Sequence, residues 1–458
     1  MRHLPKPKLA FLGLAMLALG GCASFSLDGG LDSVSQLTQQ RTGQAVTLSK
    51  GAPSDADASR VQALLAAQLT PDAAVQIALM NNPGLKAAFA DLGVSEADLV
   101  QAGRLRNPGI SFTHVSGGSG TEVDRSVTLD LAGILVIPLR RGIEKNRFEQ
   151  AKLETAMKAT QLAADTRRAF FNAVAAQQTA QFMEQVAASA EASAELARRM
   201  AKVGNWSKLD QSREQVFYAE AVAQQARALQ NVTASREQLT RLLGLAGDQL
   251  AFTLPDRLPD LPKDARVLPD AESQAMSQRL DIQVAKRNVD AMASSLGLTR
   301  ATGFINVLDA GYADKRTTGV LVQRGYTISL ELPIFDWGGA RTAKAEALYM
   351  GAVQRTADAA NRAQSEVREA YASYRTSYDL ARHYRDEIVP LRKQISDEML
   401  LRYNGMLAST FELLADSRDQ MTSVNAAIEA QRDFWIADTA LQSAMTSGPA
   451  NSQMSTAQ

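Results

Sequence analysis

The chain has 458 residues, and its basic and acidic side chains number 49 each, so the formal net charge is zero. A single hydrophobic core seldom serves more than about 300 residues, so this length predicts two domains, a duplication or a non-globular architecture. A neutral chain lacks the basic face that nucleic acid binding needs, and one cysteine and three histidines offer little for disulfides, metal binding or histidine catalysis. We therefore expect a mostly helical protein with no catalytic residues, metal site or nucleic acid partner.

Residues 1–21 are predicted to be a lipoprotein signal peptide. A basic start precedes an uncharged apolar run from Leu9 to Leu19, which is too short to cross a bilayer comfortably. The run leads into a segment that resembles a bacterial lipobox, Leu19-Gly20-Gly21-Cys22. In such a box Cys22 becomes the new N-terminus and carries a covalent lipid, and an ordinary signal peptide with an incidental cysteine is the alternative. Ala23 in the next position resembles the signal for sorting to the outer membrane.

The rest of the chain divides into two similar halves, residues 70–253 and 270–446. A proline-rich linker, residues 254–269, is predicted to join them. Residues 22–69 are rich in Ser, Gly and Gln and predict an extended, lipidated tail, and residues 447–458 predict a flexible C-terminal tail.

Each half predicts the same order of elements: two short helices, a β-like stretch and a long helical hairpin. In the first half they cover about residues 71–82, 83–106, 109–137, 138–202 and 206–245. In the second half they cover about residues 270–279, 281–300, 302–332, 334–403 and 407–445. Thr70 is the predicted N-cap of the first helix, with Pro71 in its first position.

Equivalent landmarks recur at nearly constant spacing. Pro138 and Pro333 each precede a long helix and lie about 195 residues apart, and Gly204 and Gly405 each interrupt one and lie about 201 residues apart, too long a period for a solenoid repeat. The sequence therefore predicts one unit that is duplicated once. A helix of about 65 residues is about 100 Å long, so the long helices are rods rather than parts of a globular core.

Both long helices carry a seven-residue repeat that predicts left-handed packing against neighbouring helices. In the first helix the repeat positions are Ala169, Ala173, Ala176, Ala180, Met183, Ala187, Ala190, Ala194, Ala197 and Ala201. In the second they are Ala363, Val367, Ala370, Tyr374, Ser377, Ala381, Tyr384, Ile388, Leu391 and Ile395. Pro390 lies inside the second helix, so we expect it to bend or loosen that helix. The repeats alone would also suit a soluble coiled coil.

The β-like stretches alternate apolar and polar residues. The apolar positions are Ile110, Phe112, Val127, Leu129, Leu131, Tyr326, Ile328, Leu330 and Leu332. This alternation suits a membrane barrel with an apolar outside and a wet lumen, and a half-buried soluble sheet is the alternative. Two strands in each half give four per chain, which cannot close a barrel, and open strand edges are not tolerated in lipid. Strands in a membrane would thus require several chains, and three chains would supply twelve strands.

Three motifs carry a resemblance to a known family. They are the segment from Leu69 to Pro83 (Leu-Thr-Pro-Asp-Ala-Ala-Val-Gln-Ile-Ala-Leu-Met-Asn-Asn-Pro), Leu332-Pro333-Ile334-Phe335-Asp336-Trp337-Gly338-Gly339, and Tyr403-Asn404-Gly405 followed by Ser409 and Glu412-Leu413-Leu414. With them, residues 70–445 resemble the TolC-type outer-membrane efflux protein family. The first half departs from the second motif at residues 137–142, which keep the proline but lose the double glycine.

The resemblance implies a mainly α-helical fold with membrane β-structure. Four strands from each chain of a homotrimer would form a twelve-stranded barrel in the outer membrane, continued by a long α-helical barrel across the periplasm. A periplasmic adaptor and an inner-membrane pump would dock at the far end, and the chain itself would be a passive, lipid-anchored exit duct without a cofactor. An outer-membrane duct for type I secretion and a non-channel periplasmic coiled-coil lipoprotein remain as alternatives.

The two helix-to-helix turns are the candidate contact sites for the adaptor. Val203-Gly204-Asn205 resembles the family's Val-Gly-Leu turn, with Asn205 in place of the usual apolar residue, and Asp210 matches in spacing. Gly405 and Ser409 lie at the second turn. A glycine that only ends its helix is the simpler interpretation of each turn.

Glu412 is the candidate gate residue. The resemblance places an acidic residue just after the second turn, where three copies would form a ring of carboxylates. Such a ring would favour cations and raise the pKa of each carboxyl group. The alternative is a solvated glutamate that the helix N-terminus stabilises.

Overall fold

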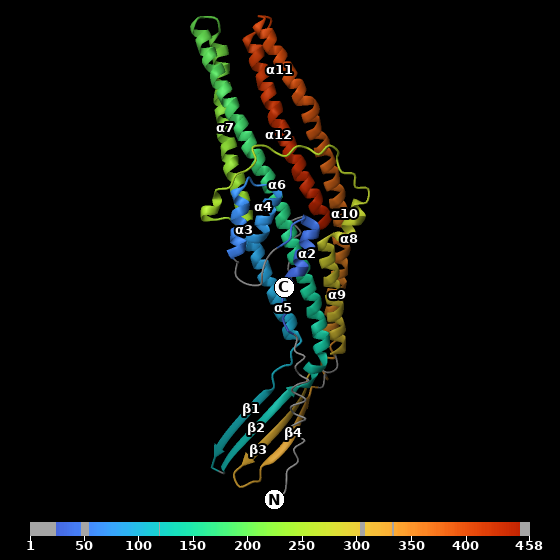
Figure 1. The fold of residues 1–458 in the computed structure, drawn as a ribbon. Helices are drawn as coiled ribbons and strands as arrows, with labels where there is room; N and C mark the ends of the chain where they lie inside the picture. Colours follow the sequence, from blue (N-terminus) through green and yellow to red (C-terminus); the bar gives the residue numbers. More distant parts are fainter. Residues whose placement is uncertain (1–23, 47–54, 119, 303–306, 332–333, 449–458) are drawn as a thin grey trace. The chain divides into compact units, whose positions relative to one another are not determined.

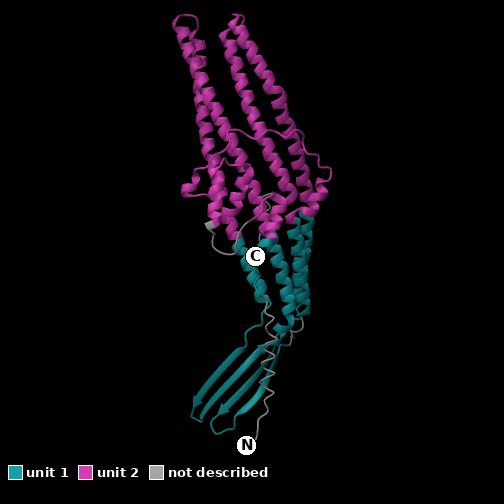
Figure 2. Cartoon of the chain, viewed as in Figure 1, with its two compact units in different colours: residues 1–32, 89–154, 282–359 teal, residues 33–88, 155–281, 360–458 magenta. Residues whose placement is uncertain are grey.

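A computed structural model describes residues 24–46, 55–118, 120–302, 307–331 and 334–448 (Figure 1). The predicted signal peptide and lipobox, including Cys22, lie outside these residues. The chain forms two compact units, which Figure 2 shows in separate colours. Unit 1 contains residues 1–32, 89–154 and 282–359, and unit 2 contains residues 33–88, 155–281 and 360–458.

Unit 1 contains a four-stranded antiparallel sheet. Its strands are β1 (Gly109–Gly117), β2 (Gly120–Asp130), β3 (Leu308–Thr317) and β4 (Gln323–Leu330), and they lie in chain order across the sheet. The predicted two strands per half are confirmed. Because β2 pairs with β3, a single sheet joins the two halves of the sequence.

The predicted end of the first β-like stretch was wrong. Residues 131–137 are helical, and Pro138 lies inside α6 (Leu131–Lys202) rather than before it. The side chain of Asp130 explains the early start, because its Oδ1 accepts a hydrogen bond from the backbone N–H of Gly133 at 2.6 Å, as an N-cap does. In the second half, Leu332 and Pro333 lie outside the residues that the structure describes, and α10 (Gly339–His383) begins after them.

Four long helices have residues in both units: α5 (Pro83–Ala102), α6, α9 (Leu280–Ala301) and α10. Unit 2 adds α4 (Pro71–Asn81), α7 (Lys208–Leu243), α8 (Ala271–Gln278), α11 (Val389–Asn404) and α12 (Thr410–Thr446). The predicted cap is present, since Thr70 Oγ1 accepts from the backbone N–H of Ala73 at 3.1 Å. None of the described helices is both long and apolar enough to cross a membrane.

The core of unit 2 lies where the α4 segment packs against the long helices. Ile77, Phe170 and Leu243 are each fully buried in one apolar cluster. Side chains from the Asn-Asn pair fix the end of α7: Asn82 Nδ2 donates to Leu242 O at 2.9 Å and Asn81 Nδ2 to Gly244 O at 2.7 Å. Residues 69–83, which form the first of the three motifs, thus hold the C-terminal end of α7 in place.

The expectation of an extended tail over residues 22–69 was wrong in part. Helices α2 (Leu31–Thr42) and α3 (Asp55–Ala66) form within it. Val34 is completely buried and Val61 is a member of the core cluster of unit 2. Apolar residues at helical spacing outweigh the Ser- and Gln-rich composition, because burying them stabilises the helix more than its propensities do.

The first seven-residue repeat is confirmed. Every predicted position from Ala169 to Ala197 is at most 9% exposed, and only Ala201, next to the turn, is half-buried. Met183 and Ala187 of this seam pack with Ala221 of α7. The seam therefore faces the neighbouring helix over most of its length.

The second repeat holds through Ile388, since the predicted positions Tyr384 and Ile388 are half-buried, and then changes phase by one residue. Leu391 and Ile395 are 56% and 47% exposed, whereas Arg392 and Ser396 are half-buried. A π-helical turn at Tyr384–Ile388 causes the shift, since it adds one residue to the helix just before Pro390. Pro390 does loosen the helix, because a proline has no N–H for the usual helical bond.

Candidate functional site

The first hairpin turn ends α6 with a left-handed glycine. Gly204 has φ of 80° and donates from its N–H to Ala201 O at 3.1 Å, while Asn205 N–H donates to Met200 O at 2.9 Å. These two bonds form a Schellman motif, in which a left-handed residue satisfies the last carbonyl groups of the helix. Val203 and Asn205 are therefore presented to solvent at the end of the hairpin.

The second turn has the same motif, but its left-handed residue is Met406 and not Gly405. Met406 has φ of 59° and donates to Tyr403 O at 3.0 Å, and Leu407 donates to Arg402 O at 2.8 Å. The sequence pairing of Gly204 with Gly405 is therefore wrong by one residue. The structural equivalents are Gly204 and Met406, so Leu407 occupies the position of Asn205.

Both turns lead into the next helix through the same cap. Ser207 Oγ accepts from Asp210 N–H at 3.1 Å and donates to Asp210 Oδ2 at 2.7 Å. Ser409 Oγ accepts from Glu412 N–H at 3.2 Å, and Glu412 Oε2 accepts from Ser409 N–H at 2.8 Å. Sequence reasoning missed Ser207, although a serine three residues before an acid is a capping-box signal in both turns.

Glu412 lies on the exposed surface of a single chain, in the third position of α12. The hydrogen bonds from the backbone and the hydroxyl of Ser409 lower the pKa of its carboxyl group. In a single chain, Glu412 therefore has the alternative role stated above, that of an acid stabilised at a helix N-terminus. A ring of three such carboxylates would need the neighbouring chains.

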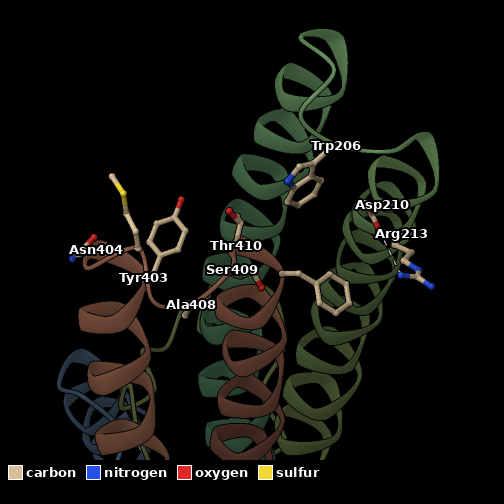
Figure 3. A pocket seen from close by; sticks show the side chains of 10 residues that line it. Trp206, Asp210, Arg213, Tyr403, Asn404, Ala408, Ser409 and Thr410 are labelled. Carbon is tan, nitrogen blue, oxygen red and sulfur yellow. Dashed lines mark ion pairs between the residues drawn. The ribbon is translucent and has the colours of Figure 1, made fainter.

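A groove of about 720 Å³ separates the two turns within unit 2. Figure 3 shows that Trp206 from the first turn and Tyr403 from the second contribute aromatic side chains to it. Arg213 contributes a charge, held 3.5 Å from Asp210 and with its guanidinium 5.9 Å from the centre of the Phe411 ring. The groove thus combines aromatic surface with a positioned cation, a composition typical of protein interfaces.

Large apolar side chains are exposed around this groove. They are Val203, Leu209, Leu401, Met406, Leu407 and Phe411, and their exposed fractions reach 93% at Met406. Several exposed apolar side chains at the ends of two hairpins indicate a surface that another protein covers.

A buried ion pair lies behind the turns. Glu214 of α7 is 1% exposed, and its carboxylate accepts from Arg418 Nη2 of α12 at 2.7 Å and from Ser193 Oγ of α6 at 2.8 Å. The Arg418 guanidinium also lies 4.2 Å from the centre of the Phe217 ring. This network joins the two hairpins, and sequence reasoning missed it because the partners are far apart in the chain.

The sheet of unit 1 has two chemically different faces. The apolar face carries the predicted alternating residues that lie within the strands, whereas Leu131 is helical and Leu332 lies outside the described residues. The register aligns Ile110, Val127, Tyr312 and Tyr326 in one cross-strand row. The polar face carries Ser, Thr and charged side chains, among them Glu122, Asp124, Asp130, Asp309 and Lys315. The apolar face is exposed in one chain, with Tyr326 at 85% and Ile328 at 65%.

Two histidines and one tryptophan lie outside the turns and the core clusters. His114 and His383 are both exposed, and His383 Nδ1 lies 3.2 Å from Glu387 Oε2 one helical turn further along. No group of His, Cys, Asp and Glu that could hold a metal ion occurs among the described residues. Trp337, which the sequence places at a strand-to-helix junction, is 65% exposed.

Comparisons with known proteins agree with this geometry. Residues 74–245 match the family model described as outer membrane efflux protein. The cobalt-zinc-cadmium resistance protein CzcC of Cupriavidus metallidurans is 24% identical over 285 residues, which make up 59% of this chain and 64% of that protein. The match therefore spans less than two thirds of this relative.

Two solved structures share the fold. A membrane protein from Pseudomonas aeruginosa superposes with a TM-score of 0.72 at 20% identity, covering 82% of this chain and 90% of that one. The CmeC outer membrane channel of Campylobacter jejuni superposes with a TM-score of 0.71 at 15% identity, covering 82% and 86%.

Proposed function

We propose that this chain, which belongs to the outer membrane efflux protein family through residues 74–245, is one subunit of a trimeric exit duct in the outer membrane. The observation that carries the proposal is the open sheet of unit 1, with one apolar face, one polar face and two edge strands, β1 and β4. The apolar face of such a sheet is stable against lipid rather than water. The free backbone N–H and C=O groups of its edge strands need hydrogen bonds from other strands.

Closure by copies of the same chain meets both needs. If β1 of one copy pairs with β4 of the next, three copies close twelve strands with the apolar face outward and the polar face around a lumen. The long helices would then line the passage beyond the barrel. Transport through it would be passive, and an inner-membrane pump would supply the energy.

The two turns of unit 2 are the proposed docking surface for a periplasmic adaptor. The exposed apolar side chains and the aromatic groove between the turns support this assignment. Val203, Gly204, Asn205 and Asp210 would contact the adaptor from the first turn, with Gly405, Met406, Leu407 and Ser409 from the second.

Glu412 is the proposed gate residue. Three copies of α12 around one axis would bring its exposed carboxylates to a common constriction, where they would favour cations. The polar face of the sheet supports the same preference, since its acidic side chains, Glu122, Asp124, Asp130 and Asp309, outnumber the one basic side chain on that face of the described strands, Lys315. We infer that the cargo is cationic or travels with its acidic groups shielded.

Covalent lipid on Cys22 is the proposed anchor to the outer membrane. The support is the sequence Leu19-Gly20-Gly21-Cys22 at the end of a short apolar run. Labelling with radioactive palmitate would test it: wild-type chain should incorporate the label and Cys22→Ser should not. Equal incorporation into both would exclude this anchor.

Fractionation tests the duct itself. The chain should sediment with outer membranes and migrate as a trimer that heating converts to monomer. A monomer in the soluble periplasm would instead support the coiled-coil lipoprotein. A duct for type I secretion would be distinguished by its partner, since co-purification would recover a peptide-exporting transporter rather than an efflux pump.

A further inference from the structure

The apolar face of the sheet changes character abruptly along the strands. One row joins Ile110, Val127, Tyr312 and Tyr326, and the next row toward the hairpin turns joins Phe112, Arg125, Asp314 and Arg324. Arg316 follows on the same face, one row further along β3. Within these two rows, three arginines and one aspartate therefore lie beside Phe112 and Val123. We call Arg125, Arg316 and Arg324 the arginine rim.

We propose that the arginine rim binds the phosphate groups of anionic lipids at the outer surface of the membrane. The inference rests on the proposed function, which places the apolar face against lipid and the hairpin turns away from the helices. It adds a lipid-binding site to the duct. Its ligand is a membrane lipid that carries phosphate on its headgroup.

The free-energy cost of burying a charge in lipid determines the depth of the arginine rim in the membrane. An arginine on the outside of a membrane barrel is strongly destabilising at the bilayer midplane and nearly neutral at the interface, where its guanidinium stays hydrated. Three arginines on one short surface therefore place that surface at the headgroups. Phosphate is the acidic group that headgroups present there.

Aromatic side chains mark the same boundary. Tyr312 and Tyr326 pair directly across β3 and β4, in the row just before the rim, and are 52% and 85% exposed. Past the other end of β4, Phe335 and Trp337 are 100% and 65% exposed. Aromatic residues gather at both interfaces of membrane proteins, so the apolar band is bounded by aromatic side chains and the rim lies just beyond one of them.

The rim has more positive charge than its own acid can neutralise. Asp314 accepts from Arg316 Nε at 3.2 Å and from Arg324 Nε at 3.3 Å, and these contacts use only the Nε atoms. One carboxylate thus faces two guanidinium groups, so the rim keeps a net positive charge, and guanidinium groups bind phosphate through two parallel hydrogen bonds. Arg125 lies with its guanidinium 5.9 Å from the centre of the Phe112 ring, which orients it over an apolar neighbour.

Lipid binding by the purified trimer tests the proposal. The probe is fluorescent bisphosphorylated lipid A, compared with its monophosphorylated form and with phosphatidylethanolamine. The test variant is R125Q/R316Q/R324Q. The matched control is R382Q/K393Q/R402Q, which removes the same charge from exposed helix positions.

We expect the wild type and the control to bind lipid A equally, with affinity that falls as salt rises, and the rim variant to bind at least tenfold more weakly. R125K/R316K/R324K, which keeps the charge but not the fork, should lie between them. Equal binding by the rim variant would overturn the proposal. Displacement of lipid A by millimolar inorganic phosphate would also overturn it, because the site would then recognise a free anion.

Depth measurements give a second, independent test. The β3–β4 turn carries exposed Val320 and Leu321, and if these entered the hydrocarbon the rim would lie inside the bilayer. A nitroxide on Arg324→Cys should be more accessible to a water-soluble nickel chelate than one on Ile328→Cys. The reverse order would contradict the proposal even if the trimer is intact, whereas loss of the trimer from the membrane would refute the duct as well.

Discussion

Gly204 and Met406 occupy the same left-handed position in two copies of one turn, with φ of 80° and 59°. A glycine adopts this conformation without strain, whereas a methionine pays a cost of about 1–2 kcal/mol. The first turn is therefore relaxed and the second is strained. The strained turn also presents the most exposed apolar side chain of the proposed docking surface, since Met406 is 93% exposed.

Exchange of these residues should reveal the asymmetry. Gly204→Ala should destabilise the first turn by about 1 kcal/mol, while Met406→Gly should change the second by less than about 0.5 kcal/mol, because relief of strain offsets the added freedom of the unfolded chain. Amide hydrogen exchange at residues 200–207 and 402–409 measures both. Equal loss of protection in the two variants would contradict the difference in backbone strain between the two turns.

Met406→Gly should also separate docking from stability. It removes an exposed apolar side chain without disturbing the backbone, so binding of the adaptor should weaken several-fold while melting is unchanged. Leu400→Ala, on the same hairpin but outside the groove and 50% exposed, is the control. Unchanged adaptor binding by Met406→Gly would remove this residue from the docking surface.

The buried Glu214 depends on Arg418. Arg418→Leu should destabilise unit 2 by about 3 kcal/mol, because it leaves a carboxylate that is 1% exposed without its cation. Glu220→Ala, on an exposed position of the same helix, is the control and should be neutral. Thermal melting followed by circular dichroism measures both, and a neutral Arg418→Leu would mean that the hairpins are held together elsewhere.

Acid should loosen the second turn. The pKa of Glu412 is lowered from its ordinary value of 4.5 by the hydrogen bonds from Ser409, so its contribution to stability is present above that value and is lost as the pH falls through the lowered pKa. Glu412→Gln should abolish this pH dependence and keep a capping acceptor. Hydrogen exchange at the turn between pH 3 and 6 checks it, and a pH profile shared with the wild type would disprove the assignment.

The same variant tests the gate. A ring of three carboxylates should make the channel cation-selective, so Glu412→Gln should lower the permeability ratio of potassium over chloride in single-channel recordings. Unchanged selectivity would show that the acid serves only as a cap.

The helix α2 should be part of the folded protein. Val34 is fully buried, so Val34→Asp should place an unpaired charge in the interior and expose residues 31–42 to protease. Ser33→Asp, at a partly exposed neighbouring position, should leave protection intact. Rapid cleavage of the wild type at these residues would contradict the packing.

The sequence predicted the parts of the fold that depend on periodicity. The alanine seam of α6, the turns after Lys202 and Asn404, and the two strands per half follow from spacings of seven and two, which local packing dictates. The predicted seam failed only at Leu391 and Ile395, after Ile388, because a seven-residue spacing in the sequence cannot reveal the extra residue that the π-helical turn inserts before Pro390.

Contacts between distant residues were beyond sequence reasoning. Glu214 and Arg418 lie on different hairpins, so no local pattern links them. The pairing of Gly204 with Gly405 was wrong because it assumed that the left-handed residue of each turn is a glycine. In the second turn that residue is Met406. Ser207 could have been found, since Ser409 and Glu412 form the same motif in the other half.

Disulfide trapping between the edge strands tests the central claim most directly. Within one sheet β1 and β4 are separated by two strands, or about 14 Å, which is too far for a disulfide. Thr113→Cys combined in turn with Gly325→Cys, Thr327→Cys or Ser329→Cys should, for one register, give covalent dimers and trimers and nothing larger, while each single variant stays monomeric under denaturing conditions. Absence of cross-links in every pair, or a ladder that continues past the trimer, would contradict a closed barrel of three chains.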